Sequence, residues 1–432
     1  LELITLARDA DFDTGTAAED EALADVASSA EFRASLYAFD LVQRRAKRPA
    51  GAPDPAAARP VTKVGIVGAG LMATQLALLF ARRLEVPVVM TDVDEGRLAK
   101  GLAGIRREVE KLAAKGRLTP DRANRVVGLV TGSTGKDGFA DADFVVEAVF
   151  EELKVKQQVF AELEGVVSPE CVLATNTSSL SVSAMAAGLA HPQRVVGFHF
   201  FNPVAVLPLL EVVRGTHTDD ETLATAFAVG RELKKSGVLV KDAPAFVFNR
   251  LVIRAIGEVL AAVDEGTPFE VAEAAVSELA MPMPPFALVQ LVGPAIALHT
   301  AETLHEAFPE RFAVSEGLRR LVAAGKPGIY AYDERGRPSV DPEAVALWPQ
   351  GDRPLPPAEV LDRSRCALAE EIACMLAEGV VAAPEDIDLC LILGGGWAFW
   401  NGGITPYLDR TGVSERVNRR RFHPPPVASG SG

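Results

Sequence analysis

Two ionisable residues lie in apolar surroundings, and their types suit proton transfer. His199 ends an apolar run in G-F-H-F-F-N-P, and Glu211 lies inside the next apolar run, L-P-L-L-E-V-V. A carboxylate in such a run is costly unless it is paired, and a neighbouring imidazolium would satisfy it. A carboxylate can also hold the tautomer of a histidine that acts as a general base. The pair is therefore a candidate acid–base centre; the alternative for His199 is a core histidine bonded to a backbone carbonyl.

A further polar group is N-T-S-S-L, residues 176–180, which follows an apolar run. Its hydroxyl and amide groups, those of Asn176 and Ser178 among them, are donors for a ligand oxygen. Such clusters also cap helices, a role open to Ser179 or Ser181. We expect surface or structural roles for the other five histidines, which lie in polar or mixed surroundings: His191, His217, His299, His305 and His423.

A glycine-rich turn predicts a dinucleotide site. Residues 63–73 read K-V-G-I-V-G-A-G-L-M-A, a G-x-G-x-x-G/A pattern that follows an apolar strand and opens a helix expected from Leu71 to about Leu84. The first glycine permits the tight turn, the second lets a pyrophosphate approach the backbone, and the alanine packs helix against strand. The helix N-terminus offers free N–H groups to the phosphates. The residues expected at the cofactor are Gly68, Gly70, Leu71, Met72 and Ala73.

The next expected strand ends at Asp92, 22 residues after Gly70. A carboxylate there accepts hydrogen bonds from a ribose diol and repels a 2′-phosphate, so NAD is favoured over NADP. The alternative is a glycine turn without a ligand. Because the strand, the helix and the acidic residue occur together in the required order, the sequence predicts NAD binding.

Short β-rich runs alternate with helical stretches from Val61 to residue 243, which predicts a parallel sheet covered on both faces. In such a doubly wound sheet, ligands lie beyond the carboxyl ends of the strands, where His199 and residues 176–180 fall. After residue 243 the strands stop and helical periodicity takes over. The expected strands are 63–68, 86–92, 144–149, 171–176, 194–200 and 209–213.

The helical part contains a candidate repeat at a constant offset of 113 residues, in which residues 249–266 align with residues 362–379. Four identities in 18 positions are a weak signal, because amphipathic helices converge easily. A duplication predicts two helical domains, with the proline-rich residues 333–357 as the connection between them. The coinciding positions are Arg250/Arg363, Glu258/Glu371, Glu265/Glu378 and Gly266/Gly379.

We therefore expect a Rossmann-type doubly wound α/β domain followed by two all-α domains. Residues 48–60 read as a linker, and the end of the tail, residues 419–432, is expected to be disordered. Residues 31–47 read as an amphipathic helix with one apolar side, made of Phe32, Leu36, Phe39, Leu41 and Val42. The expected boundaries are 1–60 for the N-terminal helix and linker, 61–243 for the NAD-binding domain, 244–332 and 358–413 for the helical domains, and 414–432 for the tail.

Composition narrows the function classes. The chain has 432 residues, of which 48% are hydrophobic and 24% charged, as in an ordinary globular protein of about three domains. A net charge of −14 disfavours binding to nucleic acid or anionic membranes. No apolar run reaches the ~18 residues that a membrane-spanning helix needs. The four cysteines form no C-x-x-C pair, which indicates a reducing, cytoplasmic location, and we expect no metal site.

Taken together, these residues resemble L-3-hydroxyacyl-CoA dehydrogenases, and most closely the dehydrogenase part of multifunctional fatty-acid β-oxidation α-subunits. The likeness is strong over residues 61–330 and looser over residues 358–412. In the multifunctional members the helical domain, which has the fold of the 6-phosphogluconate dehydrogenase C-terminal domain, is duplicated. The matching stretches are GIVGAGLMA (65–73), VVEAVFEELKVKQQVF (145–160), NTSSLSV (176–182), GFHFFNPVAVLPLLEVV (197–213) and DAPAFVFNRLV (242–252).

The resemblance implies oxidation of an L-3-hydroxyacyl-CoA to a 3-ketoacyl-CoA in fatty-acid β-oxidation, with NAD⁺ as hydride acceptor. His199 would be the general base and Glu211 its partner, while Ser178 and Asn249 would hydrogen-bond the reacting oxygen. The helical arm 94–125 would help to hold coenzyme A through Lys111 and Lys115, although an exposed helix is also simply a solvated face. Residues implied along the NAD site are Glu151, Lys156, Asn176, Ser178 and Asn202.

One departure from the family pattern bears on this site. Ala245 replaces a glycine just before the helix that carries Asn249. If this position needs a positive φ, alanine costs about 1 kcal/mol, and we expect activity to survive.

The resemblance also implies partners: a thiolase subunit, and an enoyl-CoA hydratase domain N-terminal to this chain. The hydratase body is missing from the sequence, which begins at Leu1, so we expect a piece of a longer polypeptide that does not itself hydrate enoyl-CoA. Single-domain relatives dimerise through their helical domain, and a second copy within this chain would take the partner's place.

Two other functions stay open. One is a 3-hydroxy-acid dehydrogenase that acts on a free acid without coenzyme A. The other is a non-catalytic structural or assembly module of the same fold, as lens λ-crystallin is. The presence of Ser178, His199, Glu211 and Asn249 argues against the second, because a purely structural protein has no physical need for a buried His–Glu pair.

Overall fold

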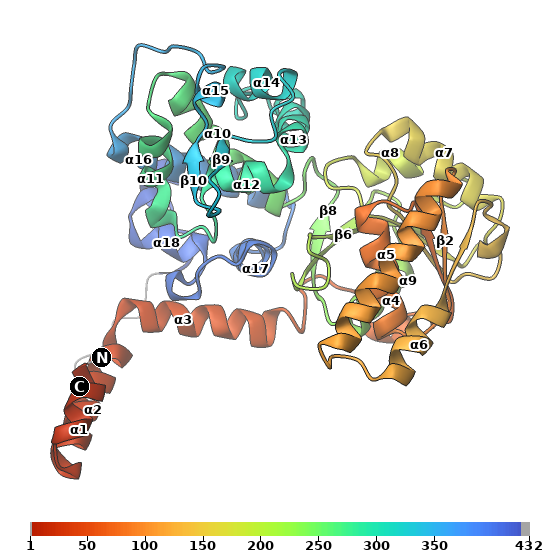
Figure 1. The fold of residues 1–432 in the computed structure, drawn as a ribbon, viewed down its shortest axis with the longest axis horizontal. Coiled ribbons are helices and arrows are strands. Elements are labelled where there is room, and N and C mark those ends of the chain that lie inside the picture. Colours follow the sequence, from red (N-terminus) through yellow and green to blue (C-terminus); the bar gives the residue numbers. More distant parts are fainter. Residues whose placement is uncertain (1, 425–432) are drawn as a thin grey trace.

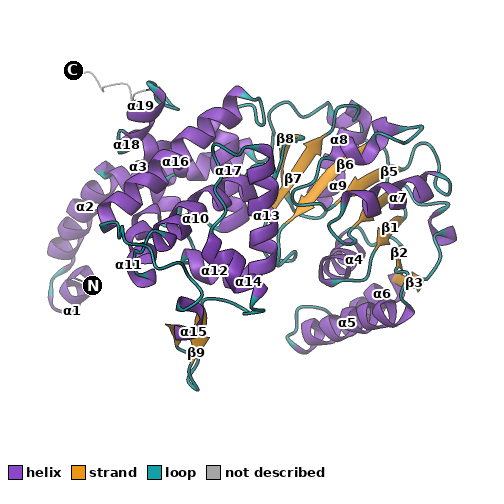
Figure 2. Cartoon of the chain, turned by 90° about the horizontal axis from the view of Figure 1, so that it is seen from above, coloured by secondary structure: helices purple, strands orange, loops and turns teal. Residues whose placement is uncertain are grey.

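The computed structural model describes residues 2–424 and shows an α/β part beside an all-helical part (Figures 1 and 2). The α/β part is built on an eight-stranded sheet of order β3-β2-β1-β4-β5-β6-β7-β8. This outward winding from the centre is the predicted doubly wound arrangement. The strands are β1 (Val64–Val67), β2 (Val88–Thr91), β3 (Val130–Ser133), β4 (Phe144–Glu147), β5 (Val172–Thr175), β6 (Val195–Phe200), β7 (Leu209–Arg214) and β8 (Ser236–Lys241).

All six predicted strands are present, but the expectation of a fully parallel sheet is wrong at β7, which runs antiparallel to β6. The reason is the connection, residues 201–208, which is too short for the crossover that parallel neighbours need. Two strands were missed. β3 is a polar edge strand, V-T-G-S, and β8 contains a glycine that weakens the β-strand signal.

Helices cover both faces of the sheet, and the two sides of each strand belong to different cores. On one face, α4, α5 and α9 share a core with Ile66 and Val146, and on the other, α7 and α8 share a core with Val145 and Leu173. The helix predicted from Leu71 is confirmed as α4. The helices of this part are α4 (Leu71–Arg83), α5 (Glu95–Ala114), α6 (Pro120–Leu129), α7 (Leu153–Glu164), α8 (Val182–Ala186) and α9 (Asp220–Glu232).

The helical part follows a short segment after β8. Its first half is α10 (Phe248–Asp264), α11 (Phe269–Ala275), α12 (Pro285–Val292), α13 (Pro294–Ala307) and α14 (Glu316–Ala323). Its second half is α16 (Pro357–Ala377), α17 (Pro384–Gly395), α18 (Ile404–Arg410) and α19 (Val413–Asn418). Helices α10 and α16 carry the predicted repeat, and each is followed by a glycine of positive φ, Gly266 at 109° and Gly379 at 66°.

The connection between the two halves is more structured than predicted. The expectation that strands stop after residue 243 is wrong, because an antiparallel hairpin forms from β9 (Tyr330–Tyr332) and β10 (Pro338–Val340), followed by a short helix, α15 (Pro342–Val345). The hairpin turn is closed by Asp333, whose carboxylate accepts backbone N–H groups from residues 335 and 337. Turn chemistry of this kind was hidden by the neighbouring prolines.

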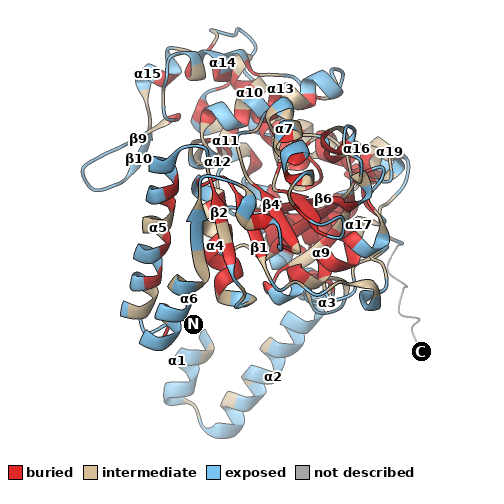
Figure 3. Ribbon diagram, turned by 90° about the vertical axis from the view of Figure 1, so that its right-hand side faces the viewer, coloured by how far each residue is buried: buried red, intermediate tan, exposed pale blue. Residues whose placement is uncertain are grey.

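The N-terminal segment forms three helices, α1 (Glu2–Asp9), α2 (Phe12–Ser28) and α3 (Ala30–Asp40). The first two extend from the body and bury no residue (Figures 1 and 3). The predicted apolar face is wrong for Phe32, Leu36 and Phe39, which are exposed, whereas Leu41, just after α3, is buried as expected and Val42 packs against the same core. The buried residues of α3 itself are Ala34 and Ala38. Small residues pack because the backbone at Gly402 comes close, so that a Cβ built there would lie 3.0 Å from the Ala34 Cβ.

Helix α3 is tied to the second helical half by polar contacts. The Tyr37 hydroxyl donates to Asp388 Oδ2 at 2.9 Å, and Asp388 also accepts the Thr405 backbone N–H at 2.9 Å. Asp388 is completely buried, and burial raises its pKa to about 7 against the opposing effect of the Thr405 and Tyr37 hydrogen bonds.

The chain end is partly packed. The Phe422 and His423 backbone N–H groups both donate to the Asp409 carboxylate at 2.9 Å, so the disorder predicted for residues 419–432 is wrong for its first part. The rest of that prediction, at residues 425–432, lies outside the described residues. Among residues 2–424, no single helix is long and apolar enough to cross a membrane, although the bent pair α12–α13 passes by length and composition.

Candidate active site

His199 and Glu211 face each other across the antiparallel pair β6–β7, where they are register partners. His199 Nδ1 lies 2.7 Å from Glu211 Oε2, and the two side chains are 5% and 0% exposed. The carboxylate accepts the Nδ1–H and therefore leaves Nε2 as the free acceptor of the imidazole. Within residues 2–424, no hydrogen bond to Nε2 is present. The His199 ring packs against Phe201 and Phe246, with ring centroids 4.4 and 5.6 Å apart.

The second oxygen of Glu211 is held by the helical part of the molecule. Glu211 Oε1 accepts the backbone N–H of Val247 at 3.2 Å and of Phe248 at 3.0 Å. These are the unpaired amides at the start of α10, where the helix dipole also favours a negative charge. The buried carboxylate is thus satisfied by an imidazole from the sheet and two amides from a helix.

The backbone before α10 adopts a conformation that favours glycine. Ala245 and Phe246 have φ angles of 56° and 53°, both in the left-handed region. The positive φ that the missing glycine suggested is therefore present at Ala245. The two residues turn the chain so that the next two amides point at Glu211.

Asn249 and Ser178 lie together beside this pair. The Asn249 amide nitrogen donates to the Ser178 carbonyl oxygen at 3.4 Å, and the Ser178 N–H donates to Glu151 Oε1 at 2.9 Å. Burial acts to raise the pKa of Glu151, but the Lys156 ammonium and the donors at Thr177 and Ser178 outweigh it, so the pKa is lowered. Glu151 is therefore a charged anchor for the loop that carries Ser178.

A buried network at the ends of β4 and β5 was missed by the sequence reasoning. Glu147 is fully buried; its Oε1 lies 2.8 Å from Lys156 Nζ, and its Oε2 accepts the Thr175 hydroxyl at 2.7 Å. Lys156 Nζ also lies 3.1 Å from Glu151. The signal was available, because Glu147 interrupts the apolar run F-V-V-E-A-V just as Glu211 interrupts its own.

The glycine turn fits a dinucleotide. At Gly68, with φ 110°, a Cβ would lie 2.7 Å from the Ala148 carbonyl oxygen, so only glycine is tolerated. At Gly70, the N-cap of α4, a Cβ would meet nothing within 4 Å, which leaves room for phosphates at the helix N-terminus. Ala73, in the first turn of α4, is fully buried, as its position in the pattern requires. Leu71 and Met72 begin α4, and Leu71 is exposed.

Asp92 follows β2, and its carboxylate is 12% exposed. Oδ2 accepts the Ala69 N–H of the glycine turn at 3.0 Å, and Oδ1 lies 3.2 Å from Arg97 Nε. Asp92, which is predicted to bind the ribose, is therefore hydrogen-bonded to the turn that would hold the phosphates.

Asn176 and Asn202 accept hydrogen bonds near His199. Asn176 Oδ1 accepts the Phe200 N–H at 3.0 Å, and Asn202 Oδ1 accepts the Gln75 side-chain amide at 2.9 Å. Beneath this loop, burial together with Arg83 lowers the pKa of Lys235 to about 8, and its ammonium donates to the Leu207 carbonyl at 2.6 Å. Sequence reasoning did not point to Gln75 or Lys235, because their partners are backbone groups or lie far along the chain.

The structure does not bring the two lysines proposed for coenzyme A to the other site residues. Lys111 lies in the last turn of α5 and pairs with Glu108 at 3.3 Å, and Lys115 is the C-cap residue of that helix. Both are exposed. The start of α5 follows Asp92, and at 1.5 Å per residue Lys111 lies roughly 24 Å further along the helix. Their role stays a prediction.

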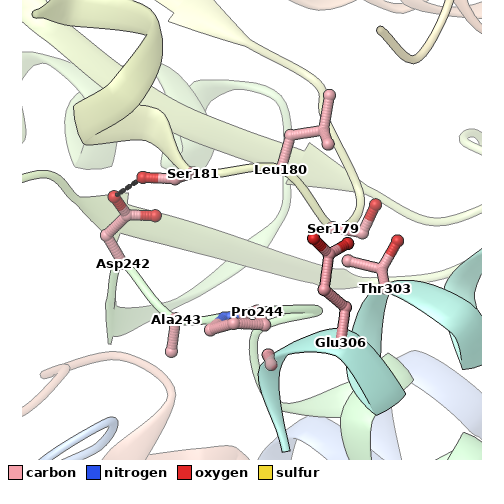
Figure 4. A pocket seen from close by; sticks show the side chains of 9 residues that line it. Ser179, Leu180, Ser181, Asp242, Ala243, Pro244, Thr303 and Glu306 are labelled. Atoms are coloured by element: carbon pink, nitrogen blue, oxygen red, sulfur yellow. Dashed lines mark hydrogen bonds between the residues drawn. The ribbon is translucent and has the colours of Figure 1, made fainter. Parts of the chain in front are cut away.

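A pocket of about 290 Å³ opens beside the Ser178 loop, between the α/β part and α13 (Figure 4). The loop contributes Ser179 and Ser181, and α13 contributes Thr303 and Glu306. Ser181 is also the N-cap of α8, one of the capping roles considered above, and its hydroxyl donates to Asp242 at 2.7 Å. His199 does not line this pocket, which flanks the pair rather than containing it.

Comparison with known proteins shows the family of the chain. The family model of the 3-hydroxyacyl-CoA dehydrogenase NAD binding domain matches residues 63–243, and that of the C-terminal domain matches residues 246–332. The fatty acid oxidation complex subunit alpha of Acinetobacter baumannii (strain SDF) is 32% identical over 417 residues, 93% of this chain. The chain spans 57% of the length of that relative.

Solved structures show the same fold. (S)-3-Hydroxybutyryl-CoA dehydrogenase PaaH1 from Ralstonia eutropha is 33% identical with a TM-score of 0.58, covering 62% of this chain and 95% of its own. 3-Hydroxybutyryl-CoA dehydrogenase from Escherichia coli K12 is 23% identical with a TM-score of 0.69, covering 85% of this chain and 97% of its own. The second likeness shows the fold alone.

Proposed function

Because this chain belongs to the 3-hydroxyacyl-CoA dehydrogenase family, whose members are NAD-dependent oxidoreductases, we propose that it oxidises L-3-hydroxyacyl-CoA to 3-ketoacyl-CoA at the His199–Glu211 pair. The observation that carries the proposal is the buried imidazole with its Nδ1 held by a carboxylate and its Nε2 free. This arrangement supplies a base in a sheet whose first turn is built for a dinucleotide.

In the proposed reaction, His199 Nε2 accepts the proton of the substrate hydroxyl, and Glu211 stabilises the imidazolium that forms. The amides of Val247 and Phe248 hold the Glu211 carboxylate in place. Ser178 and Asn249, which touch each other, donate hydrogen bonds to the substrate oxygen as negative charge develops on it. When bound, NAD⁺ supplies the hydride acceptor. Gly68, Gly70 and Asp92 would hold it.

The test is turnover in the reducing direction. The purified chain is mixed with NADH and acetoacetyl-CoA, and the loss of NADH absorbance is followed for the parent, His199→Ala and the exposed control His217→Ala. We expect activity in the parent and the control and its loss in His199→Ala. No turnover by the parent, with NADH binding intact, would contradict the proposal. Turnover of acetoacetate at an equal rate would favour a 3-hydroxy-acid dehydrogenase that does not need coenzyme A.

The wider setting of the chain is also a proposal. We propose a place in fatty-acid β-oxidation, with an enoyl-CoA hydratase domain N-terminal to this chain and a thiolase subunit as partner; the likeness to the α-subunit of a fatty acid oxidation complex supports this. The four cysteines are free, which supports the predicted reducing, cytoplasmic location.

A further inference from the structure

The arginine that follows Asn249 is clamped by the second helical half. Arg250 of α10 donates through Nε to Glu371 of α16 at 2.5 Å and through Nη2 to Glu378 at 2.8 Å. These carboxylates lie eight and fifteen positions after Arg363, the counterpart of Arg250 in the repeat. The ion pairs join the two copies.

Arg363 on α16 makes the matching contacts in the opposite direction. Its Nε lies 3.2 Å from Glu258 and its Nη1 lies 2.9 Å from Glu265, which are eight and fifteen positions after Arg250. Each copy therefore uses the same three side chains to bind the other. This self-complementary pattern is that of an isologous two-fold interface, here formed within one chain.

The two sets of contacts differ in burial. Arg250 and Glu371 are both 0% exposed, and Arg311 adds contacts to Glu371 at 3.2 Å and to Glu378 at 3.1 Å. The Phe308 ring lies under both guanidinium groups, 4.5 and 4.0 Å from their carbons. We call Arg250, Arg311, Glu371 and Glu378 the Arg250 clamp. Removing one partner of such a buried pair leaves an uncompensated charge.

The matching set around Arg363 is more open, and no site residue lies beside it. Arg363 is 31% exposed, and its partners Glu258 and Glu265 are 17% and 35% exposed. The position equivalent to Asn249 is Asp362, which pairs with Arg416 on the surface. The second copy thus keeps the interface and lacks the site.

The Arg250 clamp lies within one turn of the groups that hold the site. Arg250 directly follows Asn249, and the amides that bind Glu211 belong to the two residues before Asn249. A shift of α10 along its axis would move all of these groups together. The backbone at Ala245 is strained and leads into α10, and such strain persists only where surrounding contacts hold the chain.

We propose that the second helical half is a positioning element for the reaction, and that the Arg250 clamp is the contact through which it acts. Glu371 and Glu378 hold Arg250, and the first turn of α10 is thereby kept against the His199–Glu211 pair. The clamp residues are positioning residues because they act through α10. The inference rests on the dehydrogenase function proposed above.

The repeat supplies a matched control for the test. Glu378 and Glu265 occupy equivalent positions, each pairs with the arginine of the other copy, and they are 36% and 35% exposed. Glu378 also contacts Arg311. We expect Glu378→Gln to lower kcat about tenfold, because a small displacement at the site is enough for that loss. We expect Glu265→Gln to stay within about twofold of the parent. The KM for NADH should be unchanged in both, since neither residue contacts the glycine turn.

A second readout does not depend on turnover. Hydrogen exchange of the amides at residues 247 and 248, measured on the full chain, should be faster in Glu378→Gln and unchanged in Glu265→Gln. Equal kcat and equal exchange in the two variants would overturn the proposal. The proposal would also be overturned if both variants lost kcat equally and in step with the fall of their urea midpoints. An interface with a purely structural role predicts that result. An inactive parent would count against the proposed function, while the exchange comparison would still decide the positioning.

Discussion

Two glutamates, Glu211 and Glu147, lie fully buried in the same sheet and have opposite kinds of partner. Glu147 faces the amine of Lys156, and its other donors are the Val149 backbone N–H and the Thr175 hydroxyl. Glu211 faces the imidazole of His199, and its other donors come from α10. The first network is complete within the α/β part, whereas the second needs the helical part.

The comparison teaches that the partner decides what a buried carboxylate does. A carboxylate beside a lysine fixes structure, because neither group gains by changing its protonation. A carboxylate beside a histidine can support a proton transfer, because the pair is more stable when the imidazole is charged. Asp388 in the helical half is a third case, since it is buried with hydroxyl and amide donors, and the ring nitrogen Nε2 of His423 lies 3.9 Å from its Oδ2.

The largest expected effect separates the two glutamates directly. We expect Glu211→Gln to lower kcat by about 10²- to 10⁴-fold, because the imidazolium loses its counter-charge. Glu147→Gln should lower kcat by less than about tenfold, since its carboxylate does not touch His199. Steady-state assays with NADH and acetoacetyl-CoA measure both. Equal losses of kcat would show that the partner does not matter and would break the comparison.

The next prediction concerns stability. Lys156→Met leaves Glu147 buried without a cation, so we expect the free energy of unfolding to fall by about 3–5 kcal/mol, as for other broken buried pairs. Urea denaturation measures this. The matched control is Lys154→Met on the exposed face of α7, which should change stability by less than about 0.5 kcal/mol. A small change for Lys156→Met would mean that Glu147 is not held by charge.

Asp388 gives a prediction about how the stability of the protein depends on pH. Its folded pKa is raised to about 7, so the folded state binds more protons than the unfolded chain between about pH 4 and 7. This group's contribution to stability is therefore highest at low pH and falls as the pH rises to 7. We expect Asp388→Asn to gain a few kcal/mol relative to the parent between pH 4 and 8, measured from urea midpoints. A difference between the two proteins that is independent of pH would contradict this assignment.

Asp92 is a carboxylate whose proposed partner is the cofactor. We expect Asp92→Ser to raise the KM for NADH about tenfold and to allow turnover with NADPH, because the charge that repels a 2′-phosphate is removed and Arg97 is released. The control is Asp94→Ser, which keeps a side chain that can cap α5 and should not alter the choice of cofactor. An unchanged preference for NADH over NADPH would mean that Asp92 does not contact the ribose.

The smallest effect tests the strained backbone that delivers the amides to Glu211. We expect Ala245→Gly to raise the free energy of unfolding by about 1 kcal/mol, because glycine adopts the positive φ without strain. kcat should not fall. Thermal unfolding of the two proteins measures the difference, and a loss of stability would mean that the methyl group's packing outweighs the strain.

The parts of the site that could be predicted are those with a local pattern. The glycine turn is a contiguous motif, and the pairing of His199 with Glu211 followed from a buried charge that needed a partner. The same reasoning applied to Glu147 and was not used, although Lys156 lay nine residues away. The amides at Val247 and Phe248 gave no signal, because every residue has a backbone N–H and only tertiary packing selects which one faces a carboxylate.

The fold shows the same division. The alternation of strands and helices was sufficient for the doubly wound sheet, but the direction of β7 depended on a short connection whose length was not considered. In α3, hydrophobicity pointed to Phe32 and Leu36, whereas the close approach of the Gly402 backbone selected Ala34. Four identities made the repeat visible, but they gave no sign that each arginine binds the glutamates of the other copy.

The reciprocal ion pairs between α10 and α16 have a consequence for how the protein behaves at low concentration. In a dimer of separate chains, such an interface obeys mass action and is lost on dilution. Here the two copies are covalently joined, so the second copy is always present at a high effective concentration. The specific activity should therefore be the same at nanomolar and micromolar protein. One chain can then keep a single working site and let its other copy diverge.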